Sequence, residues 1–263
     1  MTIAEIHGKI SGSGSNISDR LEDLLTSDVF GPLRYLPSCE GLLPVLCQAQ
    51  LYSGSRKKLE VSFVRGEPEV CFWPRMECSE PDVLIKYDDH LLMIEAKYLS
   101  GKSGSYDEDA DEPTTSDQLA REFQDLMEYE GDFKKRSLIY LTAHRTMPKD
   151  DLTISYNRIC KEYKKRYQEN TYWLSWVDVR KTIKNCCEKN KDLDPHKKLI
   201  LEDIERLLHR KGMRGFEGFR GLDIQKVDRV SGVIFYERGM GFSGLKLNEV
   251  NIVPGTIFYQ QNA

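Results

Sequence analysis

Apolar residues recur at helical spacing near the start of the chain. The positions that form this stripe are Ile17, Leu21, Leu24, Leu25 and Val29. Because residues three and four apart share one face of a helix, we predict a helix over residues 17–36, capped by Ser15 or Asn16 and limited by Pro32 and Pro37.

Runs rich in β-branched and aromatic residues follow, bounded by turn-forming residues. They are KLEVSFV (58–64), EVCFWP (69–74), PDVLIKY (81–87) and LLMIEAKY (91–98). Their composition predicts consecutive strands, with a hairpin turn at residues 65–68 and a second turn at Asp88 and Asp89.

Helical and strand patterns alternate over the next hundred residues. We predict helices near 116–130, 155–168, from Asp178 onward and 196–211, with strands at 137–143 and 171–177. Clustered strands followed by this alternation predict an α/β fold with a central mixed sheet flanked by helices. The last fifty residues are rich in Gly and contain strand-like runs. We expect a main domain at 1–195 and an extension at 196–263, which includes the last expected helix and these runs.

Composition and charge exclude several classes of protein. The 263 residues carry a net charge of -4, which argues against a protein that coats nucleic acid by bulk charge. No window of eighteen apolar residues is present, so we expect a soluble, cytoplasmic protein without a membrane segment. Seven scattered cysteines without a C-x-x-C pair are interpreted as reduced core thiols, not as a zinc site.

The most informative stretch is residues 81–98. If Asp88 and Asp89 form a two-residue turn, partner numbers sum to 177, and Asp82 lies directly opposite Glu95. Lys97, two residues beyond Glu95, then points to the same face of the sheet. A three-residue turn through His90 would instead make the pairing diagonal.

Two directly opposed carboxylates repel each other, so a cation is expected beside them. Mg²⁺ takes carboxylate oxygens and keeps waters for substrate oxygens, and it can activate water for attack on a phosphodiester. The alternative is a surface hairpin with an ordinary cross-strand ion pair.

Pro81-Asp82, a gap of twelve residues and Glu95-Ala96-Lys97 resemble the PD-(D/E)xK motif of the restriction-endonuclease-like nuclease superfamily. The resemblance covers roughly residues 17–143 and implies a restriction-endonuclease-like core. It implies that Asp82, Glu95 and the backbone of Ala96 bind Mg²⁺, for which Mn²⁺ would substitute, and that Lys97 assists hydrolysis.

Two auxiliary residues are suggested by branches of the same superfamily. Glu22, in the first predicted helix, corresponds to an acidic residue that joins the metal site, although an ordinary solvated residue fits the pattern equally. Gln118 corresponds to a glutamine in the helix after the motif of RecB-type nucleases. The alternative for Gln118 is a capping box with Thr115.

Other motifs carry weaker signals. Residues 96–103 match a relaxed phosphate-binding loop, but acids follow where phosphate would bind, and the G-x-G-x-x-G at 239–244 has no helix after it. A basic helix face is expected from Arg158, Lys161, Lys164, Lys165 and Arg166. Such a face is either a phosphate-contact surface or simply solvated.

These observations predict a Mg²⁺-dependent nuclease that acts on DNA, with a role in restriction or anti-phage defence suggested by the resemblance. Asp82, Glu95 and Lys97 are the expected catalytic residues, with Gln118 and Glu22 as auxiliaries. A homodimer or a partner protein is a further expectation. The alternative is a catalytically silent module that keeps the nuclease fold to bind a protein or nucleic acid.

Overall fold

The computed structural model describes residues 17–54, 57–61, 67–98, 117–190 and 193–215. The expected cap at Ser15 or Asn16, the turn residues Arg65 and Gly66, and the Gly-rich segment from residue 216 onward lie outside these ranges. Among the described residues, no helix combines the length and the apolar character needed to cross a membrane.

A six-stranded mixed sheet forms the centre of the fold. Its spatial order is β1-β6-β5-β4-β3-β2. The strands are β1 (Gln50–Leu51), β2 (Glu69–Phe72), β3 (Val83–Lys86), β4 (His90–Lys97), β5 (Lys135–Thr142) and β6 (Thr171–Ser175). Strands β4, β5 and β6 are parallel, whereas β3 and β2 continue the sheet antiparallel to β4 and β1 pairs antiparallel with β6.

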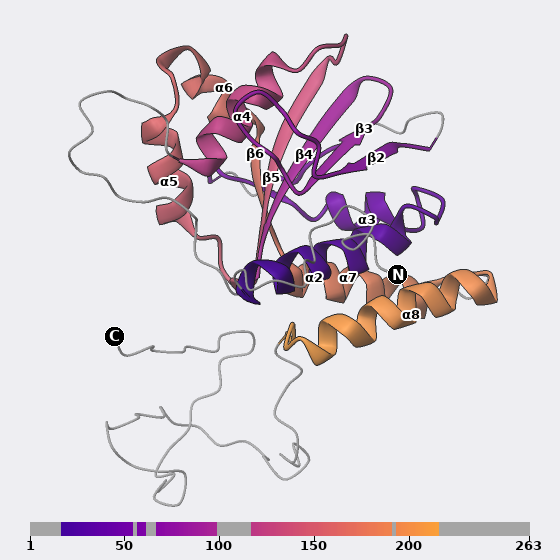
Figure 1. The fold of residues 1–263 in the computed structure, drawn as a ribbon. Helices are drawn as coiled ribbons and strands as arrows, with labels where there is room; N and C mark the ends of the chain where they lie inside the picture. Colours follow the sequence, from indigo (N-terminus) through magenta and orange to yellow (C-terminus); the bar gives the residue numbers. More distant parts are fainter. Residues whose placement is uncertain (1–16, 55–56, 62–66, 99–116, 191–192, 216–263) are drawn as a thin grey trace, which may run out of the picture. The chain divides into compact units, whose positions relative to one another are not determined.

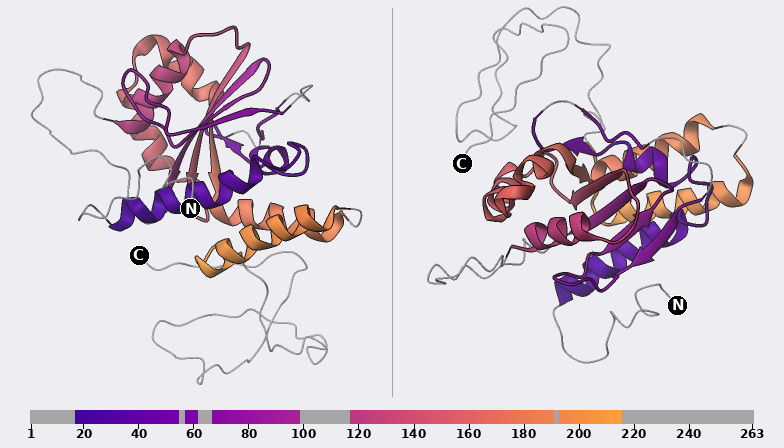
Figure 2. Two further views of the ribbon diagram at one scale, coloured as in Figure 1. Left: turned by 45° about the vertical axis from the view of Figure 1, so that its right-hand side comes forward. Right: turned by 90° about the horizontal axis from the view of Figure 1, so that it is seen from above.

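Helices cover both faces of this sheet (Figures 1 and 2). One face carries α2 (Ile17–Leu33), α3 (Leu42–Leu46), α7 (Trp176–Lys189) and α8 (Pro195–Arg210). The other carries α4 (Gln118–Glu128), α5 (Lys149–Arg158), the 3₁₀ turn η1 (Lys161–Tyr163) and α6 (Lys164–Asn170). The predicted α/β class with a mixed sheet is confirmed.

Alternation along β4 explains the two cores. Leu92, Ile94 and Ala96 pack on the α2 and α7 face, whereas Leu91 and Met93 pack on the α4 face. Every residue of β4 is buried, as expected for a central strand covered on both sides. Side chains alternate along a strand, so Glu95 and Lys97 lie on the same face as Leu91 and Met93, the α4 face.

Several expected boundaries are wrong in detail. The helix expected at 155–168 is divided, because Ile159 and Cys160 have extended backbones and separate α5 from η1 and α6. The strand expected at 171–177 stops at Ser175, whose hydroxyl caps α7 by accepting from the Val177 amide. Lys58, at the start of the strand expected at 58–64, forms an isolated bridge with Gln50, and residues 62–64 of that strand lie outside the described ranges.

The helix α8 belongs to the main body of the fold. Leu201, Ile204 and Leu208 are buried in the core shared with α2 and α7, and one compact unit extends through Gly215. Gly212 adopts a positive φ of 84° directly after the helix, as a glycine that ends a helix does. The part of the extension up to Gly215 is thus integral to the main unit.

None of the seven cysteines is fully buried. Cys39, Cys78 and Cys160 are exposed and the other four are half-buried, with none in a disulfide. The expectation of reduced thiols is confirmed, but only Cys71, Cys186 and Cys187 pack against a core, so the interpretation as core thiols is wrong for the exposed cysteines.

Candidate active site

The β3–β4 hairpin places Asp82 against Glu95. Val83 pairs with Ile94 and Leu84 with Met93, so partner numbers sum to 177, and the Tyr87 amide donates to the His90 carbonyl across the turn. The two-residue turn is confirmed, and the diagonal alternative is wrong. Asp82 lies one position before β3, at the end of the hairpin away from the turn.

Both oxygens of the Asp82 carboxyl accept hydrogen bonds from fixed donors. The Ala96 amide donates to Oδ2 over 2.8 Å and the Trp73 indole to Oδ1 over 3.1 Å. The side chain is almost completely buried. Burial raises the pKa of Asp82 well above its usual value, and the neighbouring Glu95 carboxylate raises it further. The carboxyl group is thus rigidly held where its charge is costly.

Trp73 contacts Asp82, and the sequence did not reveal this role. Its φ is +45°, a left-handed conformation that costs a residue other than glycine about 1–3 kcal/mol. Its amide also donates to the carbonyl of Asp82 over 3.0 Å. A tryptophan at the end of a β-rich run looks like an ordinary core residue, so no local pattern marks this role.

Glu95 and Lys97 form the centre of the cluster. The Lys97 ammonium lies 2.6 Å from Glu95 Oε1, and the Gln118 amide donates to the same oxygen. Burial raises the pKa of Glu95, and the Glu122 carboxyl raises it further. For Lys97, burial lowers the pKa, but the carboxylates of Glu95 and Glu22 outweigh it and the net pKa is raised. Lys97 is therefore a firmly charged ammonium.

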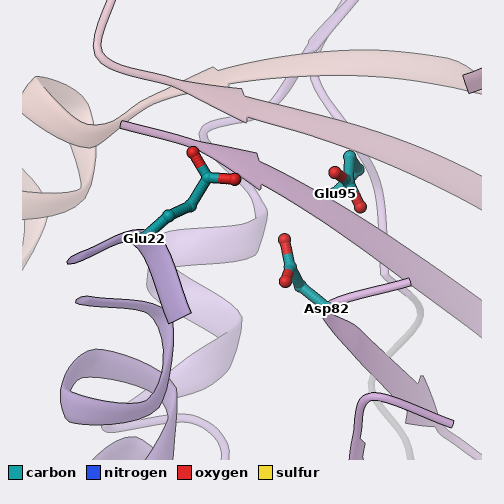
Figure 3. Close-up of side chains that lie close together, drawn as sticks. All are labelled: Glu22, Asp82 and Glu95. Atoms are coloured by element: carbon teal, nitrogen blue, oxygen red, sulfur yellow. The ribbon is translucent and has the colours of Figure 1, made fainter. Parts of the chain in front are cut away.

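Glu22 reaches the cluster from α2. Its Oε1 lies 3.0 Å from the Lys97 ammonium, and its Oε2 accepts from the Tyr98 amide over 2.8 Å. The structure thus places Glu22 in the site, and the solvated alternative is wrong. Oxygens of Glu22, Asp82 and Glu95 lie within 4.8 Å of one another, and Figure 3 shows the three carboxyl groups turned toward a shared space.

Gln118 begins α4, and its amide faces the sheet. The cap of this helix is Asp117, whose carboxylate accepts from the Ala120 amide. The capping-box alternative for Gln118 is therefore wrong, and its contact is with Glu95 instead. The alternative of a surface hairpin with an ordinary ion pair is also wrong, because Asp82, Glu95 and Lys97 are all buried.

Glu122 is a second residue that the sequence did not reveal. It lies one helical turn after Gln118 and is completely buried. Burial raises the pKa of Glu122 to about 8, and the Asp82 carboxylate contributes to this rise. A signal was present, because an acid between Leu119 and Leu126 falls on the apolar stripe of the helix.

The cluster lies at the edge of the sheet where ligands commonly bind. Parallel strands β4, β5 and β6 end at the same edge, and in open α/β sheets ligands bind outside the carboxyl ends of such strands. The donors are all oxygens, which suits a hard divalent cation such as Mg²⁺ or Mn²⁺. The four carboxyl groups around Lys97 would leave an excess of negative charge when ionised.

The residues of the expected basic helix face are divided among α5, η1 and α6. Arg158, Lys161, Lys165 and Arg166 are exposed and Lys164 is half-buried, while Ile159 and Tyr167 are buried. A cavity of about 590 Å³ lies elsewhere, lined by residues of α7 and α8, by Gln50 of β1 and by segments before and after α3, and it includes no residue of the cluster. The motifs at 99–103 and 239–244 lie outside the described residues.

Comparisons of the chain with protein-family models, with curated proteins and with solved structures give no match.

Proposed function

We propose that the protein is a divalent-metal-dependent nuclease that hydrolyses phosphodiester bonds in DNA. The observation that carries this proposal is the convergence of Asp82, Glu95 and Glu22 around the Lys97 ammonium in one buried site. The residues Pro81-Asp82 and Glu95-Ala96-Lys97 also resemble the PD-(D/E)xK motif.

The donor set fits Mg²⁺. Buried carboxylates that repel one another are stabilised by a cation between them. The Ala96 amide and the Trp73 indole keep the Asp82 oxygens in place before any ion arrives. Asp82, Glu95 and Glu22 would hold the ion, with the Ala96 carbonyl as the ligand implied by the resemblance. A bound Mg²⁺ would supply a Lewis acid for the phosphodiester and increase the acidity of a coordinated water.

The chain's own groups position this chemistry. Lys97 stays charged beside Glu95 and can stabilise negative charge that develops on the phosphate. Gln118 fixes the orientation of Glu95, and Trp73 fixes that of Asp82. Because the cluster is largely excluded from water, each of these electrostatic interactions is stronger than it would be in solvent.

The test is cleavage of plasmid and linear DNA by the purified chain with Mg²⁺, with Mn²⁺ and with EDTA, beside Lys97→Ala. We expect cleavage with either metal, and loss of cleavage with EDTA and in the variant. Activity that survives both chelation and the substitution would refute the proposal.

The second candidate is a silent nuclease-fold module that binds a partner. It is favoured by the net charge of -4, which opposes tight binding to a polyanion. Calorimetry with Mn²⁺ separates the two candidates. No binding by the wild type, or binding that Asp82→Ala leaves unchanged, would support the silent module.

A further inference from the structure

The backbone of Asp82 lies outside the strand ladders of the sheet. The pairing of β3 with both β2 and β4 ends at Val83, and Asp82 belongs to the stretch of residues 73–82 that joins β2 to β3, here called the β2–β3 segment. Both the amide and the indole of Trp73 donate to Asp82. The position of Asp82 therefore depends on the contacts that hold this segment in place.

Asp125 of α4 is one of these contacts. Its side chain is buried, and its carboxyl oxygens accept from the Cys78 amide over 3.1 and 3.2 Å and from the Ser79 hydroxyl. The Met76 amide donates to the Ser79 carbonyl over 2.9 Å and closes the same stretch into a turn. A buried carboxylate is costly unless hydrogen bonds compensate it. One carboxyl group of α4 thus clamps the β2–β3 segment to the helix.

The clamp is connected to Asp82 by a short, stiff stretch of chain. Asp82 follows Ser79 by three residues, which span no more than about 11 Å when extended. Pro81 stands between them and is buried. Its ring fixes its own φ and restricts the backbone of Glu80. Because few backbone torsions are free in this stretch, a displacement of Ser79 is transmitted to Asp82.

Helix α4 therefore reaches the cluster at two points. Gln118, its first residue, contacts Glu95 on β4. Asp125 follows seven residues later, two turns along, so it lies on the same side of the helix. There it contacts the segment that leads to Asp82. One helix supports both carboxyl groups of the hairpin and sets their positions relative to each other.

We propose that Asp125 is a positioning residue for Asp82. It clamps the β2–β3 segment to α4, keeps Trp73 in its left-handed conformation, and so holds the Asp82 carboxyl where it can share a cation with Glu95. Groups behind the ligands of a metal commonly change its affinity in this way. This inference rests on the proposed function, because the cation is the one proposed there.

The first experiment measures the affinity of the full, metal-stripped chain for Mn²⁺ by calorimetry. Asp125→Ala should lower this affinity by about tenfold, as expected when a group behind a metal ligand is lost. Ser79→Ala should lower it less, because the Cys78 amide still bonds Asp125. The double variant should match Asp125→Ala, since the Ser79 hydroxyl has then lost its acceptor.

The second experiment follows hydrogen exchange of the indole N–H groups by NMR in the metal-free chain. The Trp73 indole reports on the bond to Asp82. The Trp173 indole, which donates to the Thr142 hydroxyl, is an internal reference outside the segment. In Asp125→Ala the Trp73 indole should exchange about tenfold faster, because release of the segment opens it locally. The Trp173 indole should exchange at the wild-type rate.

Arg136→Met is the matched control. The Arg136 guanidinium donates to the carbonyls of Leu126 and Met127 over 2.9 and 2.7 Å, so it supports the end of the same helix without contacting the β2–β3 segment. This variant should unfold at lower urea concentration and still bind Mn²⁺ as the wild type does. If Asp125→Ala does not fold, as judged by circular dichroism, Ser79→Ala takes its place in both experiments.

An unchanged affinity for Mn²⁺ in Asp125→Ala would overturn the inference. Equal acceleration of both indoles would also overturn it, because that pattern indicates a general loss of stability. If the wild type binds Mn²⁺ and cleaves DNA while either of these results is found, the clamp alone is refuted. A wild type that binds no Mn²⁺ would refute the proposed function, and the role of Asp125 in cation binding with it.

Discussion

Two ionic clusters in this protein differ in the ratio of acidic to basic groups. Arg180 of α7 bonds Glu205 of α8 at 2.7 and 2.8 Å and donates to the Met213 carbonyl. Within the described ranges, this cluster joins two helices and pairs one cation with one carboxylate. The cluster around Lys97 has more carboxyl groups than cations.

The difference distinguishes a structural ion pair from a site that requires a ligand. A balanced pair satisfies itself, and removing one member leaves an uncompensated buried charge. An unbalanced cluster raises the pKa of its own acids, as burial and mutual repulsion do for Asp82 and Glu95. Only the second arrangement gains stability when a cation enters.

The largest expected effect is on catalysis. If the proposed function holds, Lys97→Met should reduce the rate of DNA cleavage by about 10²–10³-fold, because it removes the ammonium that we propose stabilises charge on the phosphate. Single-turnover cleavage with Mg²⁺ measures this. Arg180→Met, the equivalent change in the balanced cluster, should cleave at close to the wild-type rate, and an equal loss in both variants would contradict the distinction.

The second effect is on stability and concerns the balanced cluster. Arg180→Met should lower the free energy of unfolding by about 3 kcal/mol, because Glu205 loses the partner that compensates its partly buried charge. Urea denaturation monitored by circular dichroism measures this change. In the double variant Arg180→Met/Lys97→Met, the loss in free energy of unfolding should equal the sum of the two single losses. Such additivity would show that the two clusters act independently.

The third effect is on the pH dependence of the metal-free protein. Burial raises the pKa of Glu122 from 4.5 to about 8, so the folded chain keeps a proton that the unfolded chain releases between these values. The free energy of unfolding in EDTA should therefore fall as pH rises from 4.5 to 8. This group contributes at most about 1.4 kcal/mol per pH unit.

Glu122→Gln should make the decline in free energy of unfolding shallower, because the amide has no proton to lose. Asp125→Asn, a change in another buried acid of the same helix, is the comparison. Melting temperatures in EDTA at several pH values between 5 and 8 provide the measurement. Parallel curves for the wild type and Glu122→Gln would show that Glu122 does not titrate in this range.

The smallest effect tests the support of Asp82. Trp73→Phe removes the indole donor to Oδ1, so the affinity for Mn²⁺ should fall by about tenfold, as expected for a hydrogen bond to a charged group. Trp173→Phe removes a comparable indole bond, to the Thr142 hydroxyl, outside the cluster. Calorimetry should show that this control variant binds Mn²⁺ as the wild type does.

Much of the fold follows from local pattern. The stripe at Leu24, Leu25 and Val29, the strand at 137–143 and the helix ended by Gly212 all depend on neighbouring residues, and each is present. The break at Ile159 and Cys160 was not predicted, because the apolar spacing of Tyr156, Tyr163 and Tyr167 continues across it. That break depends on packing and not on sequence period.

The site was predictable where one hairpin creates it and less so where separate elements meet. Period two and a tight turn were enough to place Asp82, Glu95 and Lys97 together. Glu22 and Gln118 needed the resemblance, since helices far apart in sequence bring them in. Trp73 and Glu122 were missed because their roles depend on what faces them across the fold.

The turn at Asp88 and Asp89 sets a limit on how this chain can vary. Six residues separate Asp82 from Asp88, roughly 20 Å along an extended strand. A one-residue shift of pairing at that turn would exchange the faces of every side chain in one strand relative to the other. The length of this exposed turn therefore controls whether Asp82, at the far end of the hairpin, lies opposite Glu95.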